Sequence, residues 1–375
     1  MKRVAVVFGT RPEAIKMAPV VHELSRHADL ETRLIVTAQH REMLDQVLAA
    51  FELRPDLDLD LMRPGAGLAE LTARLVGALD EALAAERPDL VLVQGDTTTV
   101  FAAGLAAFYR QIPVGHVEAG LRSGDRHDPF PEEINRRLAG VVATLHFAPT
   151  ERARANLRRE GVPDEAIWLT GNTAIDALRY TLARLPPRPP ASDRRLILTT
   201  LHRRENWGAR MRSACEGLRD VLAERADVEL VLPMHRNPVV RATIQEVLGG
   251  QERVELTEPL DYPGLVDLQR RAHLVVTDSG GIQEEAPSLG KPILVLRETT
   301  ERPEGVEAGC ARLIGTDRAR VRAETLRLLD DPGAYAAMAR VANPYGDGRA
   351  AERIVAAVRA HLGLAVRGDR PGRMR

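Results

Sequence analysis

The stretch of residues 274–296, LVVTDSGGIQEEAPSLGKPILVL, constrains the fold of this chain more than any other part of the sequence. Its first four residues are apolar and mostly β-branched, which is typical of a buried parallel strand. Ser279-Gly280-Gly281 then turns the chain into a short predicted helix, IQEEA, which Pro287 bends or ends because proline lacks an amide donor. A second apolar run, Ile293–Leu296, follows. Together they predict a βαβ unit and therefore a parallel sheet.

The glycine turn of this unit is a candidate phosphate site. Glycine lets a ligand approach the backbone, and the unpaired amides at a helix start carry the positive end of the helix dipole. Glu285 lies about one turn further on, where a carboxylate would repel phosphate but could accept hydrogen bonds from two sugar hydroxyls. Phosphate followed by ribose indicates a nucleotide.

Two other interpretations of this turn compete. The two glycines could serve only close packing of the strand against the helix. The sequence Asp278-Ser279-Gly280-Gly281 also looks like the nucleophile loop of trypsin-like proteases. Those proteases are all-β proteins, whereas this chain alternates strands with helices, so the context excludes them.

Strand and helix patterns alternate along the chain, on both sides of the proline-rich segment Pro186–Pro190. This predicts an α/β protein with two doubly wound, Rossmann-like domains and a cleft between them. The tail Arg367–Arg375 is predicted to be disordered. The predicted strands are Val4–Phe8, Leu34–Thr37, Leu90–Gln94, Val114–Val117, Leu145–Ala148, Leu196–Thr200 and Glu229–Leu232, and the predicted helices include Ala14–His27, Gln39–Phe51, Leu68–Ala85 and Glu132–Val142.

Composition excludes several classes of function. With 52 Lys+Arg against 53 Asp+Glu, the net charge of -1 gives no bulk field that favours nucleic acid or an anionic membrane. Only two cysteines among 375 residues argue for a reducing compartment. The chain starts directly with a strand, without a signal peptide, and no apolar run reaches transmembrane length, so a cytoplasmic enzyme is predicted. HExxH, CxxC and GxGxxG are absent from the sequence, so neither a metal nor a bound nicotinamide cofactor is expected.

Polar side chains gather where predicted strands end, which is where an open α/β sheet binds its ligands. They are Arg11 and Lys16 after the first strand, Asp96 after the third, Glu118 after the fourth, Glu132 and Glu133 at a helix start, and His202 and His235 after strands of the second half. Each has a structural alternative when taken alone, such as a solvated face, a helix cap or a buried histidine. Three converging carboxylates are costly unless they handle protons, so the set favours acid–base chemistry.

Longer motifs are more specific: FGTRPEAIKMAP, TAQHREML, GDTTT, GHVEAGLR, PFPEEINR, TGNTAIDAL, HRREN, TDSGGIQEEAPSLGKP and RETTERPEG. In these motifs the chain resembles the non-hydrolysing UDP-N-acetylglucosamine 2-epimerase family from Val4 to about Gly348. The resemblance implies a glycosyltransferase-B-like architecture and a homodimer. It divides the chain into an N-terminal domain over residues 1–170 and a UDP-binding domain over residues 171–347. The segment 348–375 then holds a helix that crosses back to the N-terminal domain, followed by the tail.

The resemblance also assigns roles to individual positions. Asp96, Glu118 and Glu132 match the acid–base carboxylates, and His202 matches a catalytic histidine near the departing UDP. The substrate contacts it implies are Arg11, Lys16, Arg136, His235, Ser279, Gly280, Gly281, Glu285 as ribose acceptor, and Arg302. Gln39, His40 and Met43 match a regulatory site for a second UDP-N-acetylglucosamine. The segment Leu260–Leu265, which should border the uracil, carries over no contact.

The implied reaction converts UDP-N-acetylglucosamine into UDP-N-acetylmannosamine by anti elimination of UDP and its re-addition. Direct removal of the C2 proton would be prohibitively slow, because no adjacent carbonyl acidifies it. Departure of UDP builds positive charge at C1, which acidifies that proton for a carboxylate. The sequence leaves open which carboxylate is the base and which is the acid. It also leaves three alternatives: an epimerase for a modified sugar such as a 2,3-diacetamido uronate, a glycosyltransferase of the same fold, and a non-enzymatic nucleotide-sugar sensor.

Overall fold

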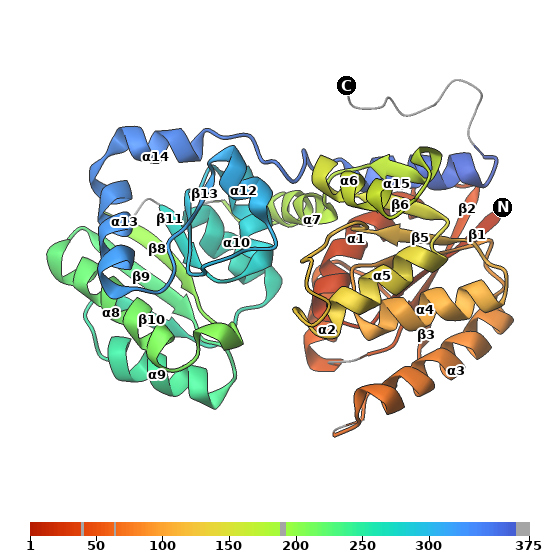
Figure 1. The fold of residues 1–375 in the computed structure, drawn as a ribbon, viewed down its shortest axis with the longest axis horizontal. Helices are drawn as coiled ribbons and strands as arrows, with labels where there is room; N and C mark the ends of the chain where they lie inside the picture. Colours follow the sequence, from red (N-terminus) through yellow and green to blue (C-terminus); the bar gives the residue numbers. More distant parts are fainter. Residues whose placement is uncertain (39–40, 64, 188–192, 365–375) are drawn as a thin grey trace. The chain divides into compact units, whose positions relative to one another are not determined.

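The computed structural model describes residues 1–38, 41–63, 65–187 and 193–364. It divides into two compact units (Figure 1). Unit 1 comprises Met1–Tyr180 together with the chain from Gly346 on, and unit 2 comprises Thr181–Tyr345. Residues 188–190 of the predicted proline-rich linker and the predicted disordered tail, 367–375, lie outside the described residues.

Unit 1 is built on a parallel sheet with the strand order β3-β2-β1-β4-β5-β6-β7. Every pairing recorded between neighbouring strands of this sheet is parallel. The strands are β1 Lys2–Phe8, β2 Leu30–Val36, β3 Leu57–Asp58, β4 Leu90–Gln94, β5 Val114–Val117, β6 Leu145–Ala148 and β7 Ile167–Leu169. The helices are α1 Arg11–Ser25, α2 Arg41–Ala50, α3 Leu68–Glu86, α4 Thr98–Tyr109, α5 Glu132–Val142, α6 Glu151–Arg159, the 3-10 turn η1 Asp164–Ala166, α7 Thr173–Leu182 and α15 Ala350–His361.

Unit 2 repeats the plan with a parallel sheet of order β10-β9-β8-β11-β12-β13. Its strands are β8 Arg195–Thr200, β9 Val228–Pro233, β10 Val254–Thr257, β11 Leu274–Thr277, β12 Ile293–Val295 and β13 Ala311–Leu313. Its helices are η2 Arg204–Asn206, α8 Ala209–Glu224, α9 Pro238–Leu248, α10 Tyr262–Arg271, α11 Gly280–Glu285, η3 Ala286–Leu289, α12 Pro303–Ala308, α13 Arg318–Asp330 and α14 Pro332–Ala339. The predicted βαβ unit over 274–296 is therefore present as β11, α11 and β12.

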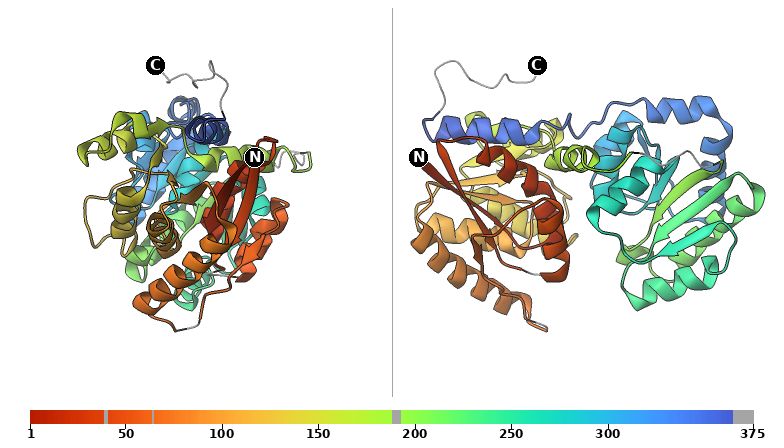
Figure 2. Two further views of the ribbon diagram at one scale, coloured as in Figure 1. Left: turned by 90° about the vertical axis from the view of Figure 1, so that its right-hand side faces the viewer. Right: turned by 180° about the vertical axis from the view of Figure 1, so that it is seen from behind.

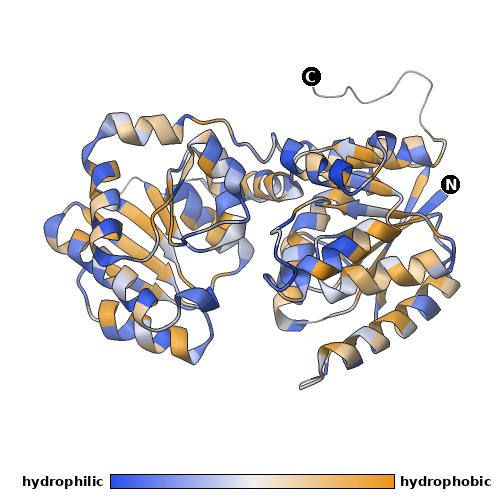
Figure 3. Cartoon of the chain, in the orientation of Figure 1, coloured by the Kyte–Doolittle hydropathy of each residue, from blue (hydrophilic) through white to orange (hydrophobic). Residues whose placement is uncertain are grey.

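Apolar strands form the core of each unit, as the hydropathy colouring shows (Figure 3). In unit 1 all five residues of β4 are buried, and in unit 2 all four residues of β11 are buried. Such strands lie under helices on both faces, which explains why their sequences are continuous apolar runs rather than alternating ones. The α/β class predicted from those runs is confirmed.

The last helix, α15, belongs to unit 1 and packs on α1 (Figure 2). Its N-terminus is held by Asp176 of α7, whose carboxylate accepts hydrogen bonds from the amides of Ala350 at 3.1 Å and Ala351 at 2.9 Å. These are two of the amides that a helix start leaves without an intrahelical acceptor. At the other end of the helix, Arg359 pairs with Asp29 at 2.8 Å.

The boundary between the units falls after Tyr180, whereas the resemblance places it after residue 170. The cause lies in α7, whose Tyr180 stacks on His22 with ring centroids 4.9 Å apart and on Phe51 at 5.1 Å. These contacts attach most of α7 to unit 1. Within the described residues, none of the helices combines the length and the apolar character that crossing a bilayer requires.

Candidate active site

Each sheet has one place where the strand order reverses: between β1 and β4 in unit 1, and between β8 and β11 in unit 2. In open α/β sheets this switch point, at the carboxyl ends of the strands, is where ligands bind. The segment after β1 is Gly9-Thr10-Arg11 and the segment after β4 is Gly95-Asp96-Thr97. In unit 2 the corresponding segments are Leu201-His202-Arg203 and Asp278-Ser279-Gly280. Six of the predicted site residues lie on these segments or in the first turn of the helix that follows: Arg11, Asp96, His202, Ser279, Gly280 and Gly281.

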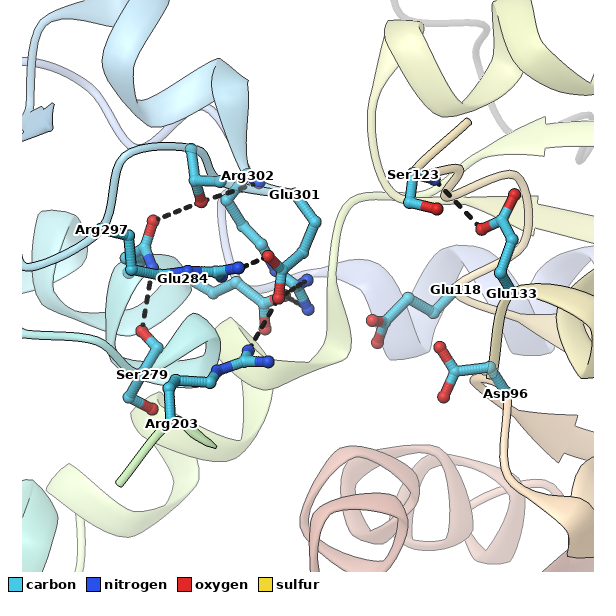
Figure 4. A network of polar contacts seen from close by, with 12 residues as sticks. Asp96, Glu118, Ser123, Glu133, Arg203, Ser279, Glu284, Arg297, Glu301 and Arg302 are labelled. Atoms are coloured by element: carbon cyan, nitrogen blue, oxygen red, sulfur yellow. Dashed lines mark hydrogen bonds and ion pairs between the residues drawn. The ribbon is translucent and has the colours of Figure 1, made fainter. Parts of the chain in front are cut away.

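Two of the predicted carboxylates follow adjacent strands of unit 1 and point the same way (Figure 4). Asp96, after β4, pairs with Arg136 of α5. Glu118, after β5, pairs with Lys16 at 2.6 Å and accepts a hydrogen bond from Gln94 at 2.8 Å. Glu118 also adopts a φ of 63°, a left-handed conformation that is uncommon for a residue with a side chain. Such conformations concentrate at functional sites, where the surrounding structure supports them.

The backbone that carries Asp96 is held from two sides. His116 of β5 contacts the carbonyl oxygen of Gly95 through Nε2 at 2.7 Å, and Asn135 of α5 donates to the carbonyl oxygen of Asp96 at 3.0 Å. Burial lowers the pKa of His116 from 6.5 to about 4, so the ring is neutral near pH 7 and donates from Nε2. Neither residue was predicted as a site residue, although His116 stands in the GHVEAGLR motif and Asn135 in PFPEEINR.

The acidic pair at the start of α5 divides into two roles. Glu133 is fully buried and binds Arg137 at 2.8 Å, Arg136 at 3.2 Å and the amide of Ser123 at 3.0 Å. Glu132 is half-buried, and its side chain makes no hydrogen bond or ion pair with other described residues. Glu133 therefore organises the local ion pairs, and Glu132, the predicted catalytic member, keeps its carboxylate available.

The glycine turn of unit 2 begins α11, and its two glycines differ in their surroundings. A Cβ on Gly280 would lie 3.3 Å from the Arg302 guanidinium carbon and 3.6 Å from Nη2 of Arg203. A Cβ on Gly281 would meet nothing within 4 Å. Glycine at 280 therefore admits two cationic side chains, and the space beside Gly281 is open.

The cationic side chains at this turn are held by carboxylates (Figure 4). Arg302 binds Glu284 at 2.9 Å, and Arg203 binds Glu301 at 2.7 Å. Glu301 also pairs with Arg297. Burial alone would raise the pKa of Glu301, but the charges of Arg302, Arg203 and Arg297 outweigh it and lower that pKa far below its usual range. Glu301 is therefore ionised, and it orders two arginines beside Gly280.

Glu285, the predicted ribose acceptor, is only 6% exposed. Tyr262 donates to its Oε1 at 3.0 Å and Gln269 to its Oε2 at 2.7 Å. These bonds fix the orientation of the carboxylate. Tyr262 lies in the segment 260–265, for which the sequence carried over no contact, and its partner is remote in sequence.

The predicted histidines lie together in unit 2. His202 places Nδ1 2.9 Å from Oδ1 of Asp278, and its ring stacks on that of His235 with centroids 6.0 Å apart. Burial and the neighbouring His202 lower the pKa of His235. Asp278 was not predicted as a site residue, although it stands in the TDSGG motif.

The remaining predicted residues are less well defined. Arg11 is half-buried at the first position of α1, and Met43 is half-buried on α2. Gln39 and His40 lie outside the described residues. Among the residues that the structure does describe, His, Cys, Asp and Glu side chains form no group of three or more arranged to hold a metal ion.

Comparison with known proteins identifies the family. The family described as UDP-N-acetylglucosamine 2-epimerase matches residues 22–359, which is most of the chain. This chain belongs to the UDP-N-acetylglucosamine 2-epimerase family. As an epimerase it is an enzyme of the isomerase class.

Relatives within the UDP-N-acetylglucosamine 2-epimerase family align over nearly their full lengths. The UDP-N-acetylglucosamine 2-epimerase of Salmonella typhimurium is 53% identical, over 96% of this chain and 99% of that protein. The Bacillus subtilis enzyme of the same name is 51% identical, over 96% of each. A crystal structure of UDP-GlcNAc 2-epimerase from Neisseria meningitidis bound to UDP-GlcNAc has a TM-score of 0.90 at 46% identity, covering 95% of this chain and 99% of that chain.

The fold extends beyond the epimerase family. The glycosyltransferase SnogD from Streptomyces nogalater has a TM-score of 0.59 at 18% identity, over 97% of this chain and 99% of that chain. This likeness shows the fold alone. It confirms that the two-sheet architecture is the glycosyltransferase-B-like one that the sequence predicts.

One further buried carboxylate joins the two strand ends of unit 1. Glu13, in the first turn of α1, accepts hydrogen bonds from the amides of Thr10 at 2.7 Å and Gly9 at 3.2 Å through one oxygen. Its other oxygen accepts from the hydroxyl of Thr97, after β4, at 2.8 Å. Burial raises the pKa of Glu13 from 4.5 to about 7, although the bonds from both threonines and both amides oppose this. The T-x-x-E spacing of a capping box could have identified the first contact but not the second.

We expect the Glu13→Gln variant to lose less stability than the wild type between about pH 5 and about pH 8. The folded-state pKa of Glu13, about 7, exceeds its ordinary value of 4.5, so folding favours the protonated carboxyl. The resulting stability is fully present below pH 4.5 and is lost as the pH rises through 7. Urea unfolding of both proteins at the two pH values measures the difference. Burial also raises the pKa of Asp176 to about 6. Asp176 is present in both proteins, so its contribution to the pH dependence cancels when the two proteins are compared. Equal losses in the two proteins would show that Glu13 does not titrate in this range.

Proposed function

We propose that this protein catalyses the reversible C2 epimerisation of UDP-N-acetylglucosamine to UDP-N-acetylmannosamine. The observation that carries the proposal is the pair Asp96 and Glu118 at the ends of adjacent strands, each held by a cation of the same unit. Glu118 combines a left-handed backbone with contacts to Lys16 and Gln94. Membership of the epimerase family and a relative solved with bound UDP-GlcNAc support the choice of substrate.

The proposed reaction is an anti elimination followed by re-addition. A carboxylate takes the C2 proton, the electrons of the C2–H bond form a double bond between C1 and C2, and the C1–O bond breaks with its electrons leaving on UDP. The intermediate is 2-acetamidoglucal. UDP then adds back to C1 while a proton is delivered to the opposite face of C2, so that no atom is gained or lost. We assign these proton transfers to Asp96, Glu118 and Glu132.

The UDP moiety is assigned to unit 2. The amides of Gly280 and Gly281 lie in the first turn of α11, where a helix favours an anion, whereas the amide of the preceding Ser279 donates to the hydroxyl of Thr277 at 2.9 Å. Their neighbour Arg302 is the cation for the diphosphate, and Glu285 is the acceptor for the ribose hydroxyls. These assignments use the open space beside Gly281 and the oriented carboxylate of Glu285.

Further contacts complete the assignment. His202 donates a hydrogen bond to the departing phosphate, and His235, stacked on it, lines the same site. Arg11 and Lys16 provide positive charge in unit 1, and Arg136 fixes the carboxylate of Asp96. Transition-state charge on leaving phosphate oxygens is best stabilised by such pre-positioned donors and cations.

The elimination route predicts isotope exchange. We expect the purified protein to convert UDP-N-acetylglucosamine in D₂O into product that carries deuterium at C2, because the returning proton comes from an exchangeable carboxylic acid. Proton NMR of the C2 position measures both stereochemistry and exchange.

Asp96→Asn, Glu118→Gln and Glu132→Gln should each lower kcat by roughly 10²-fold or more. Product that keeps its C2 hydrogen would contradict the mechanism, and absence of turnover by the wild type would contradict the function.

The nucleotide assignment predicts a selective loss of UDP. We expect Gly281→Val to weaken UDP binding by roughly tenfold or more, because its side chain would occupy the space through which a diphosphate reaches the α11 amides. The fold should be preserved, since a Cβ at this position meets nothing within 4 Å. Calorimetric titration with UDP and with uridine separates the effects, because uridine lacks the diphosphate. Equal losses for both ligands, or none for UDP, would argue against the site.

We also propose a homodimer, formed through the outer face of α4 and α5 in unit 1. This face exposes large apolar side chains that a monomer would leave in water: Phe108 at 57%, Tyr109 at 66%, Leu138 at 40% and Val141 at 82% exposed. The two helices pack against each other. Regulation by a second UDP-N-acetylglucosamine at Gln39, His40 and Met43 stays a prediction.

The dimer proposal predicts that Val141→Asp shifts the protein towards the monomer, because a carboxylate buried at an interface loses its hydration. Light scattering coupled to size exclusion would report the change as a fall towards the 41.2 kDa of one chain. Val239→Asp is a matched control, since Val239 is 52% exposed on α9 of unit 2. A wild type that already elutes as a monomer, or a dimer that both variants retain, would argue against this interface.

A further inference from the structure

We infer that Asp278 is a positioning residue for His202, one that fixes which ring nitrogen carries the proton and where the other nitrogen faces. This inference rests on the proposed function, in which His202 donates to the departing phosphate. Asp278 is itself not in contact with substrate under this assignment. It acts through the histidine.

The geometry of the pair carries the inference. Asp278 follows β11 and His202 follows β8, the two strands on either side of the unit 2 switch point. Oδ1 of Asp278 lies 2.9 Å from Nδ1 of His202. The carboxylate is 0% exposed, whereas 36% of the histidine side chain is exposed. A buried acceptor thus holds one edge of a ring whose other edge is accessible.

The charge state of Asp278 suits this role. Burial alone would raise its pKa, but the hydrogen bond and charge of His202, with the amides of Arg203 and His202, outweigh burial and lower it. An ionised carboxylate has no proton to donate, so Nδ1 of His202 must be the donor. Nε2 is then the nitrogen that faces outward, and it donates to the departing phosphate when the ring carries a proton on both nitrogens. A ring oriented by a carboxylate in this way is the general arrangement in which histidine transfers or shares protons.

Asp278 also has a structural task, which the test must separate. Its Oδ2 accepts hydrogen bonds from the amide of Arg203 at 2.9 Å, the amide of His202 at 3.0 Å and the side chain of Asn206 at 3.1 Å. These bonds fold the segment after β8 over the switch point. Asn206 takes part only in this task, because it binds Asp278 and the carbonyl oxygen of Leu296 but not the ring of His202.

Asp278→Asn is the informative substitution. The amide keeps an oxygen to accept from the backbone at Oδ2 and places its NH₂ group against Nδ1 of His202. The ring must then accept at Nδ1 and carry a single proton on Nε2, so the doubly protonated, positively charged ring that faces the phosphate is lost. We expect kcat to fall roughly 10- to 100-fold, while the affinity for UDP stays within about twofold. The matched control Asn206→Ala loosens the segment without changing the ring's proton, and we expect it to leave kcat within about threefold of the wild type.

A double mutant decides between the two tasks. If Asp278 acts through His202, then Asp278→Asn combined with His202→Ala should be no slower than His202→Ala alone. A further loss of tenfold or more in the His202→Ala background would overturn the inference, as would an unchanged kcat in Asp278→Asn. A loss in Asn206→Ala as large as that in Asp278→Asn would assign the effect to the fold of the segment.

Nitrogen-15 NMR of labelled histidine reports which ring nitrogen of His202 carries the proton, and this measurement does not depend on turnover. We expect the His202 ring of the wild type to carry its proton on Nδ1 when neutral, and the ring of Asp278→Asn to carry it on Nε2. If the wild type turns over no UDP-N-acetylglucosamine but shows this change, the proposed function fails and the pairing stands. If it turns over the substrate but both proteins share one tautomer, the pairing fails and the function stands.

Discussion

Each sheet depends on a carboxylate that crosses its switch point. Where the strand order reverses, the following helices leave towards opposite faces of the sheet, and the amides of two strand ends lack acceptors within the sheet. Glu13 accepts from both ends in unit 1, and in unit 2 Asp278, which itself follows β11, accepts from the segment after β8. Asp96 directly precedes Thr97, which donates to Glu13, and Ser279 directly follows Asp278. The contact that completes the fold at each switch point therefore also places the side chains of the proposed site.

In each unit, charged residues assigned to the proposed function are paired with opposite charges of the same unit. Lys16 has Glu118, Arg136 has Asp96, and Arg203 has Glu301. Removing two charged groups from water is unfavourable, so a largely buried ion pair is stable only when its partners are close and well oriented. Loss of one partner leaves the other as an unpaired buried charge. A bound diphosphate must therefore compete with carboxylates for Arg302 and its neighbours. The same ion pairs fix the orientation of Arg302 and Arg203.

The features predicted best from the sequence are the bounds of strands and helices that neighbouring residues determine. The bounds of β5, β6 and α5 agree with the structure, because each is bounded by local turn or capping signals. Helix α4, Thr98–Tyr109, was missed because nearly all of its first ten residues are buried, which leaves no amphipathic period to detect. Motif resemblance supplied the candidate site residues, but the partners of those residues lie far away in sequence. Asp278 and His202 are separated by 76 positions, and no local sequence pattern predicts a contact over that separation.

The order of the chain adds a constraint on folding that neither sheet reveals alone. Unit 2 is continuous in sequence, whereas unit 1 includes α15, which follows unit 2 in the chain. Ile354, Val355 and Val358 of that helix are fully buried. Without α15 their apolar partners would be exposed, and the Asp176 carboxylate would lose both amide donors. Unit 2 can therefore complete its core during synthesis, but unit 1, with the proposed acid–base carboxylates, can do so only after the last helix has docked.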